Sequence, residues 1–305
     1  MGFAGRSIIS LHDMTAGDLN RIIEATYDTK SGRESGFLRG KTIAVMFFEP
    51  STRTRLSFES AIQRSGGTVI GFANPTSSSQ SKGESFADTI RTVTGYCDAM
   101  VIRHPVEGSA RLASDIATVP VVNAGDGANQ HPTQTFLDLF TMWESFGRLD
   151  GLHIGMLGDL KYGRTVHSLA TAMSMFGARM TFISPHTLQM PDMIKRELTE
   201  AGIGFREVRQ PEEAGDDLDV LYVTRIQRER FGDPQEYESV AHSFRITSET
   251  VRSLGGRVLV MHPLPRVDEI SEDVDLLPNA IYFRQAHNGI PTRQALLGLV
   301  TGGIS

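Results

Sequence analysis

Runs of strand-forming residues alternate with helical patterns along the chain, and this alternation most constrains the fold. In the first half, the runs typical of buried strands cover Lys41–Phe48, Thr68–Phe72, Asp98–Arg103 and Val119–Val122. In the second half, they cover His153–Leu157, Arg179–Ile183, Asp219–Val223 and Arg257–Met261. Strands that alternate with helices form parallel sheets with helices on both faces. The sequence therefore predicts an α/β fold built from doubly wound parallel sheets.

The helical patterns between these strands have recognisable ends. We expect helices at Thr52–Ser65, Gly163–Phe176, Pro191–Ala201 and Thr247–Leu254. Another helix is expected to begin at Ser81, which has Glu84 three residues later, the spacing of a capping box. Its apolar residues lie on one face at helical spacing, namely Phe86, Ile90, Val93 and Cys97. We interpret Cys97 as a core residue and not as a nucleophile.

The length of the chain suggests two domains, with one large domain as the alternative. It has 305 residues, and domains average ~150 residues. A helical pattern at His131–Phe146 separates the two sets of strands, and another lies near the end at Pro291–Val300. We predict a first domain of residues 1–134 completed by 288–305, a second domain of residues 135–287, and two long helices that join them.

Composition excludes several classes of protein. The chain carries 30 Lys and Arg against 36 Asp and Glu, a net charge of −6, so we expect no nucleic-acid partner. One cysteine permits no intrachain disulfide and suggests a reducing, cytoplasmic location. We find no targeting segment and no apolar run of the ~18 residues that a membrane span needs, so we expect no membrane partner.

Basic and hydroxyl residues follow the expected strands, where parallel sheets bind ligands. Ser51, Thr52, Arg53 and Thr54 end the first strand and open a helix. A helix N-terminus offers unpaired N–H groups, and Arg53 adds a two-pronged donor, so this segment suits a phosphate. The alternative is an ordinary helix cap with surface arginines.

Other candidate residues also have structural alternatives. Arg164 and Arg225 follow strands of the second half and suit the carboxylates of an amino acid or dicarboxylate, or else an inter-domain salt bridge. His131 opens a helix, where a neutral imidazole can donate to a carbonyl oxygen or simply cap the helix. Lys82 follows a serine-rich stretch and either contacts an anion or is solvated.

Two common nucleotide motifs are absent from the sequence. It contains no G-x-x-x-x-G-K-[ST] phosphate loop. Gly155, Gly158 and Gly163 do not form G-x-G-x-x-G, so a dehydrogenase assignment has little support.

Ordered motifs from about Arg39 to Gly298 resemble those of the transcarbamoylase family. The segment Phe47–Glu59 (FFEPSTRTRLSFE) is similar to its carbamoyl-phosphate signature, and Asn129–Gln134 (NQHPTQ) to its second signature. His262–Arg266 (HPLPR) and Gly158–Ser168 (GDLKYGRTVHS) resemble the aspartate-type branch. Pro263 stands where ornithine-type members carry cysteine. The alternatives are an ornithine-type acceptor and a non-catalytic paralogue that binds an anion.

The resemblance implies the fold and the reaction. Family members fold as two α/β domains, one for carbamoyl phosphate and one for the amino acid, with the substrates between them. Members of the aspartate-type branch transfer the carbamoyl group of carbamoyl phosphate to the α-amino group of L-aspartate, in pyrimidine biosynthesis. The resemblance implies no metal and no organic cofactor.

The resemblance also implies a role for each matching residue. Ser51, Thr52, Arg53 and Thr54 would hold the phosphate. The carbonyl oxygen would be contacted by Thr54, Arg103 and His131. The carbamoyl NH₂ would be held by Gln134 and the backbone of Leu264. The carboxylates of aspartate would be bound by Arg164, Arg225 and Gln227 together with Lys82.

The expected assembly is a homotrimer with shared active sites. Ser78 and Lys82 match loop residues that reach across from the neighbouring subunit in this family. Some members also bind a zinc-bearing regulatory chain and others associate with a dihydroorotase. Lys161-Tyr162-Gly163 resembles the form found with regulatory chains.

Overall fold

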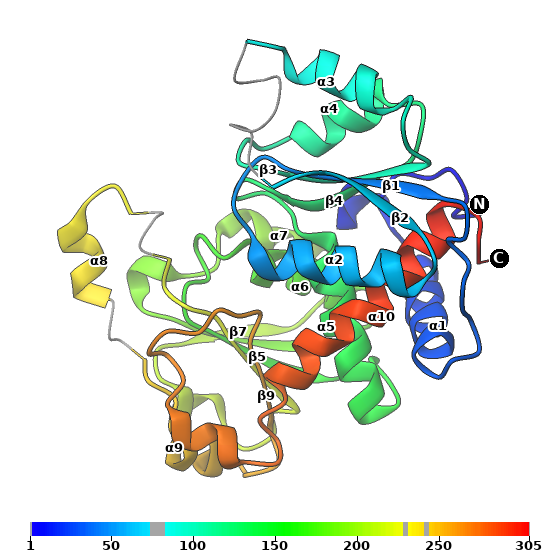
Figure 1. The fold of residues 1–305 in the computed structure, drawn as a ribbon. Coiled ribbons are helices and arrows are strands. Elements are labelled where there is room, and N and C mark those ends of the chain that lie inside the picture. The colour runs from blue at the N-terminus through cyan, green and yellow to red at the C-terminus, as the bar shows by residue number, and fades with distance from the viewer. Residues whose placement is uncertain (1, 74–82, 228–230, 241–243, 305) are drawn as a thin grey trace. The chain divides into compact units, whose positions relative to one another are not determined.

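The computed structural model describes residues 2–73, 83–227, 231–240 and 244–304. The chain divides into two compact units, which are Met1–Phe140 with Asn288–Ser305 (unit 1) and Thr141–His287 (unit 2). Each unit contains its own parallel sheet (Figure 1). The expected α/β class with two parallel-sheet domains is confirmed. The division of function between residues 1–134 with 288–305 and residues 135–287 stays a prediction.

Unit 1 contains a four-stranded parallel sheet of order β2-β1-β3-β4. Its strands are β1 (Thr42–Phe47), β2 (Thr68–Phe72), β3 (Ala99–His104) and β4 (Val121–Asp126). β1 lies between β2 and β3, with Ile43 opposite Ala99 and Phe47 opposite Arg103. A strand buried on both faces needs a continuous apolar run, which explains why TIAVMF forms the centre of this sheet.

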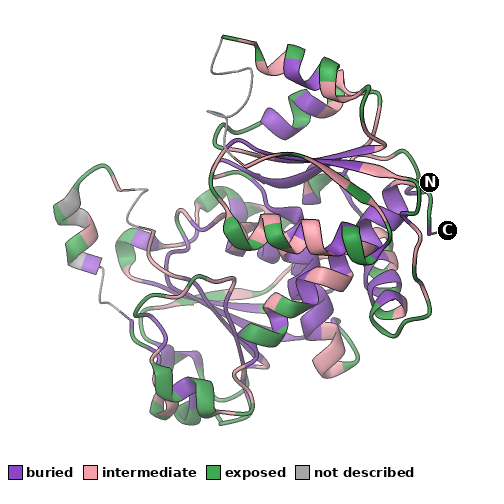
Figure 2. Ribbon diagram, in the orientation of Figure 1, coloured by how far each residue is buried: buried purple, intermediate pink, exposed green. Residues whose placement is uncertain are grey.

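Helices cover both faces of the unit 1 sheet. The helices within this unit are α1 (Ala16–Lys30), α2 (Thr52–Arg64), α3 (Phe86–Val93) and α4 (Ser109–Ile116). α2 lies against one face, and α3 and α4 lie against the other (Figure 1). On the α3–α4 face, Met46 and Ile102 of the sheet pack with Ile90 and Ala113 of the helices. The buried residues concentrate between the layers (Figure 2).

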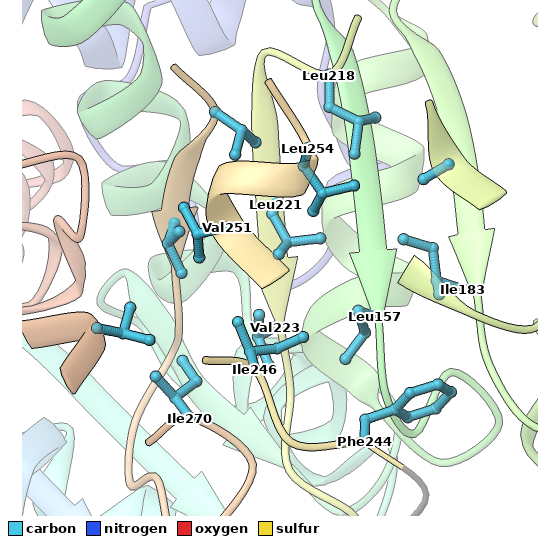
Figure 3. Packing of buried hydrophobic residues seen from close by; sticks show 14 of the residues in the cluster. Leu157, Ile183, Leu218, Leu221, Val223, Phe244, Ile246, Val251, Leu254 and Ile270 are labelled. Atoms are coloured by element: carbon cyan, nitrogen blue, oxygen red, sulfur yellow. The ribbon is translucent and has the colours of Figure 1, made fainter. Parts of the chain in front are cut away.

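Unit 2 contains a five-stranded parallel sheet of order β7-β6-β5-β8-β9. Its strands are β5 (His153–Leu157), β6 (Arg179–Ile183), β7 (Phe205–Val208), β8 (Val220–Val223) and β9 (Leu259–Met261). Its helices are α6 (Arg164–Ser174), α7 (Asp192–Glu200), α8 (Pro234–Val240) and α9 (Ser248–Ser253). Val251 of α9 and Leu254, which follows that helix, pack in one buried cluster with Leu221 of β8 (Figure 3).

Two further helices run from one unit into the other. α5 (Pro132–Phe146) passes the boundary at Phe140, and α10 (Tyr282–Val300) passes it at His287. Short 3-10 helices lie at Leu11–Asp13, His186–Leu188, Pro211–Ala214 and Glu272–Leu276. In the part of the chain that the structure describes, no helix is long and apolar enough to cross a membrane.

Two expected helix starts were wrong. α3 begins at Phe86, and its cap is Ser85, whose hydroxyl accepts from the backbone N–H of Asp88. Ser81 lies outside the described residues, and Glu84 accepts from the hydroxyl of Thr89 instead. α10 begins nine residues before Pro291 and includes it, because buried Tyr282 and Gln285 hold the preceding turns in place.

The strand orders fix where ligands can bind. In unit 1 the chain winds outward in opposite directions from β1 and β3, and in unit 2 from β5 and β8. Doubly wound sheets bind ligands at such a switch point, outside the carboxyl ends of the strands. The residues that follow β1, β3, β5 and β8 are therefore the candidates for function.

Candidate functional site

The exit of β1 is the candidate anion site of unit 1. Ser51 caps α2 in extended conformation, and its hydroxyl makes no capping bond to that helix. The first turn of α2 contains Thr52, Arg53 and Thr54 and no acidic residue. The first turn therefore carries no carboxylate of its own that would compete with a phosphate for the positive end of the helix.

Arg103 lies beside this turn, at the exit of β3. Its Nη2 is 2.7 Å from Oε1 of Glu49, and its Nη1 donates to the carbonyl of Ala124 at 3.2 Å. The side chains are largely buried, with exposed fractions of 13% for Arg103 and 22% for Glu49. Glu49 lies two residues after β1, and its place in the sequence did not reveal this role. A carboxylate held here fixes the direction of the guanidinium.

A buried carboxylate organises the approach to His131. Asp126 ends β4 and accepts from the backbone N–H of Gly108 and Gln130 and from the amide of Asn129, at 3.0–3.1 Å. These bonds shape the turn that leads to His131, which is 5% exposed and directly precedes α5. Thr133 Oγ1 lies 3.5 Å from Nδ1 of His131.

The side chain of Gln134 is held by a second buried carboxylate, that of Asp138. Its Nε2 donates to Oδ1 of Asp138 at 2.9 Å, one turn along α5. Asp138 in turn attracts the buried guanidinium of Arg293 on α10. Arg293 also donates to Oγ of Ser57 at 2.9 Å and lies over the ring of Phe58. The sequence analysis named Gln134 but not Asp138 or Arg293.

Asp159 connects the two strand exits at the switch point of unit 2. This buried carboxylate follows β5 and accepts from the backbone N–H of Tyr162 at 2.9 Å and of Gln227 at 3.4 Å. Burial raises the pKa of Asp159, and these backbone hydrogen bonds oppose that rise. Gln227 also donates through Nε2 to the carbonyl of Tyr162 at 3.3 Å. The structure thus brings Gln227 to the loop that contains Arg164.

A pocket of about 60 Å³ lies at the same strand ends. Arg225 lines it together with Gly158, Tyr237 and Glu269. Gly158 has a φ of +119°, and a Cβ at this position would collide with the carbonyl of Thr224. Glycine therefore allows the exits of β5 and β8 to approach closely. Arg164 is the first residue of α6, next to this loop.

Leu264 lies in the loop that leaves β9. Its φ is +55°, and its bond to Pro265 is cis. Its backbone N–H donates to Nδ1 of buried His262 at 2.8 Å, and Nε2 of His262 lies 2.7 Å from Oε1 of Glu269. Leu264 and the motif that begins at His262 were recognisable in the sequence, but the bond from His262 to Glu269 was not.

The structure thus groups the predicted residues within each unit. Unit 1 brings Ser51, Thr52, Arg53, Thr54 and Arg103 to adjacent strand exits. Unit 2 brings Arg164, Arg225 and Gln227 to the switch of its own sheet. Ser78 and Lys82 lie outside the described residues. Among the residues that are described, no group of three or more His, Cys, Asp or Glu could hold a metal ion.

Two parallel α/β units, each with basic residues at its topological switch point, define a two-domain protein for small anionic ligands. The family model for the carbamoyl-P binding domain of aspartate/ornithine carbamoyltransferases matches residues 6–144. The model for the Asp/Orn binding domain of the same family matches residues 150–300. The chain belongs to the aspartate/ornithine carbamoyltransferase family.

Two similar proteins bear the same name. The aspartate carbamoyltransferase catalytic subunit of Thermococcus gammatolerans is 54% identical, over 99% of both chains. That of Methanopyrus kandleri is also 54% identical, again over 99% of both chains.

Two solved structures that are similar to this chain are also aspartate transcarbamoylases. The catalytic subunit of M. jannaschii aspartate transcarbamoylase has a TM-score of 0.89 and 50% identity, covering 96% of this chain and 97% of its own. The enzyme of Trypanosoma cruzi, solved with carbamoyl aspartate and phosphate, has a TM-score of 0.91 and 37% identity, covering 98% and 97%.

Proposed function

We propose that this chain transfers the carbamoyl group of carbamoyl phosphate to the α-amino group of L-aspartate, a step of pyrimidine biosynthesis. The observation that carries the proposal is the pair of switch-point sites, one suited to phosphate and one to carboxylates, in a chain of this family. Aspartate has two carboxylates, and the second unit offers Arg164 and Arg225 near its switch point. Pro263 also favours aspartate over ornithine.

The phosphate is assigned to the first turn of α2. Ser51, Thr52, Arg53 and Thr54 supply hydroxyl, backbone and guanidinium donors to its oxygens. Carbamoyl phosphate and aspartate are both anions that repel each other. Positioning them is therefore a large part of the catalysis that we propose.

The reaction requires stabilisation of one developing charge. The amino nitrogen of aspartate attacks the carbonyl carbon, and negative charge moves to the carbonyl oxygen. The donors assigned to that oxygen are Arg103, His131 and Thr54, and losing such a donor typically lowers kcat by ~10²–10³-fold. The bond from carbon to the phosphate oxygen then breaks. Phosphate leaves and accepts the proton that the amine gives up.

The remaining assignments hold the carbamoyl NH₂ and the amino acid. Gln134 and the backbone of Leu264 are assigned to the NH₂ group. Arg164, Arg225 and Gln227 are assigned to the carboxylates of aspartate. The hydrogen bond from Gln134 to Asp138, at 2.9 Å, supports its assignment because it fixes the amide.

Initial rates test this proposal. Phosphate release from carbamoyl phosphate should require L-aspartate and should not respond to L-ornithine. Arg225→Ala should raise the KM for aspartate and leave the Kd of inorganic phosphate unchanged, because Arg225 belongs to unit 2. Release that responds to ornithine and not to aspartate would overturn the proposal.

The proposal extends to assembly. Ser78 and Lys82 are assigned to the site of a neighbouring subunit in a homotrimer, and a zinc-bearing regulatory chain is the proposed further partner. A native mass of three chains is the expected result for the purified protein, and a larger mass after adding regulatory chains is expected for the second partner. A monomeric mass would contradict the shared site.

A further inference from the structure

The loop 262–269 contains a buried pair of side chains that the reaction above does not use. His262 is 1% exposed, and Glu269 is 6% exposed. Nε2 of His262 lies 2.7 Å from Oε1 of Glu269. The other oxygen of Glu269 accepts from the backbone N–H of Val267 at 3.0 Å and of Asp268 at 3.1 Å. One carboxylate therefore ties the imidazole to the far end of the loop.

The hydrogen bonds define the tautomer of His262. The backbone N–H of Leu264 can only donate, so Nδ1 must accept, and the proton must lie on Nε2 facing Glu269. Only a neutral ring offers one acceptor and one donor. Burial lowers the pKa of His262, which keeps the ring neutral, although Glu269 opposes this shift.

This pair acts on a residue with unusual backbone geometry. Leu264 has a φ of +55° and is the one non-glycine residue with positive φ in the described part of the chain. Such a conformation is strained for a non-glycine residue and persists only where its surroundings hold it. The bond from Leu264 N–H to His262 is a restraint of this kind.

A further bond anchors the pair to α10. The backbone N–H of His262 donates to Oε1 of buried Gln285 at 2.8 Å. His262 is therefore fixed through its backbone and through both ring nitrogens, and it transmits that position to Leu264.

We propose that His262 and Glu269 are positioning residues that hold the Leu264 backbone in the conformation that receives the carbamoyl NH₂. They do not touch the reacting atoms. The inference rests on the proposed function, because that function assigns the NH₂ contact to Leu264.

Two substitutions separate the two ring nitrogens. His262→Asn keeps an oxygen close to the position of Nδ1, so it retains the acceptor for Leu264 and loses the donor to Glu269. His262→Gln places its amide near Nε2, so it retains the donor and loses the acceptor. Glu269→Gln is a third variant, which weakens the pair without altering the ring.

His153 provides a matched control. It is a buried histidine at the start of β5, and its ring nitrogens lie 2.9 Å from Thr181 Oγ1 and 3.2 Å from the carbonyl of Asp217. His153→Gln should lower Tm and leave kcat and ligand affinities unchanged. His153 is the first residue of β5, whereas His262 follows the carboxyl end of β9.

The test measures kcat, Tm and the Kd of two probes, inorganic phosphate and carbamoyl phosphate. His262→Gln should lower kcat by on the order of 10²-fold, as a displacement of about 1 Å can. His262→Gln should raise the Kd of carbamoyl phosphate and leave the Kd of inorganic phosphate unchanged, because inorganic phosphate has no NH₂ group. His262→Asn should retain more activity than His262→Gln, and Glu269→Gln should weaken carbamoyl phosphate in the same selective way.

The inference is overturned if His262→Gln behaves like His153→Gln, or if His262→Gln raises the Kd of both probes equally. It is also overturned if His262→Asn and His262→Gln are equally impaired. If His262→Gln does not fold, Glu269→Gln supplies the comparison of the two probes. Wild-type protein that forms no carbamoyl aspartate contradicts the proposed function instead, and the two Kd values still test the loop.

Discussion

Replacing Arg293 by methionine should destabilise unit 1 strongly. Arg293 is 3% exposed, and Asp138 is fully buried. The guanidinium donates to Ser57 at 2.9 Å and lies 5.0 Å from the centre of the Phe58 ring. Burial lowers the pKa of Arg293 to about 10, and attraction to Asp138 opposes that shift. The substitution therefore removes a buried cation that is attracted to the carboxylate of Asp138.

The expected cost follows from these contacts. Removing one of two buried charges that attract each other typically costs about 3–5 kcal/mol, because the other charge stays buried. Each kcal/mol shifts the Tm of a domain of this size by about 2–4 °C, which gives a loss of about 6–20 °C. The double variant Arg293→Met with Asp138→Asn should recover most of this loss, since an uncharged pair removes the buried charge.

Differential scanning calorimetry on the purified variants measures this effect. Arg284→Met is the control, because Arg284 lies on the same helix and is exposed. Its unfolding free energy should stay within about 0.5 kcal/mol of wild type. A Tm loss under about 2 °C for Arg293→Met, or a double variant no more stable than the single one, would refute the reasoning.

Three further outcomes are expected. Arg53→Ala should raise the Kd of inorganic phosphate by about 10- to 100-fold with an unchanged Tm, as expected for the loss of one charge-assisted hydrogen bond. An unchanged Kd in calorimetry would reject the phosphate assignment. Burial lowers the pKa of His167 below its ordinary 6.5. As the pH falls, His167 therefore becomes protonated in the unfolded chain before it does in the folded protein, and stability is lost below pH 6.5. His167→Gln keeps a donor for the carbonyl of Leu160 and should lose less stability between pH 7 and pH 5 in urea unfolding, whereas parallel pH profiles would argue against the burial effect. Mixed Lys82→Ala and Arg53→Ala chains, each inactive alone, should regain partial activity; no recovery after verified subunit exchange would contradict the shared site.

The strands were the most predictable part of the fold. The predicted bounds of β2, β5 and β6 agree with the structure. β5 and most of β6 are buried, as is typical of parallel sheets, whereas β2 is a partly exposed strand at the edge of its sheet. β7 was missed because Arg206 and Glu207, its central residues, are exposed and break that pattern. The sequence analysis also did not identify α1, α4 or α8.

The candidate site was predictable in part. Its basic and hydroxyl residues follow strands, so local sequence reveals them. The residues that hold these side chains in place cannot be recognised from local sequence, because their contacts join distant parts of the chain. Asp159 and Gln227 are 68 residues apart, and Arg293 and Ser57 are 236 residues apart. Only the strand order and the course of α10 bring these pairs together.

The most direct test of the proposed function is a competition between acceptors. Carbamoyl phosphate labelled at its carbon is supplied in limiting amount to the protein with equal concentrations of L-aspartate and L-ornithine. Mass spectrometry should then find the label in carbamoyl aspartate. Label in the carbamoylated product of ornithine, or none in either amino acid above a protein-free control, would contradict the proposed function.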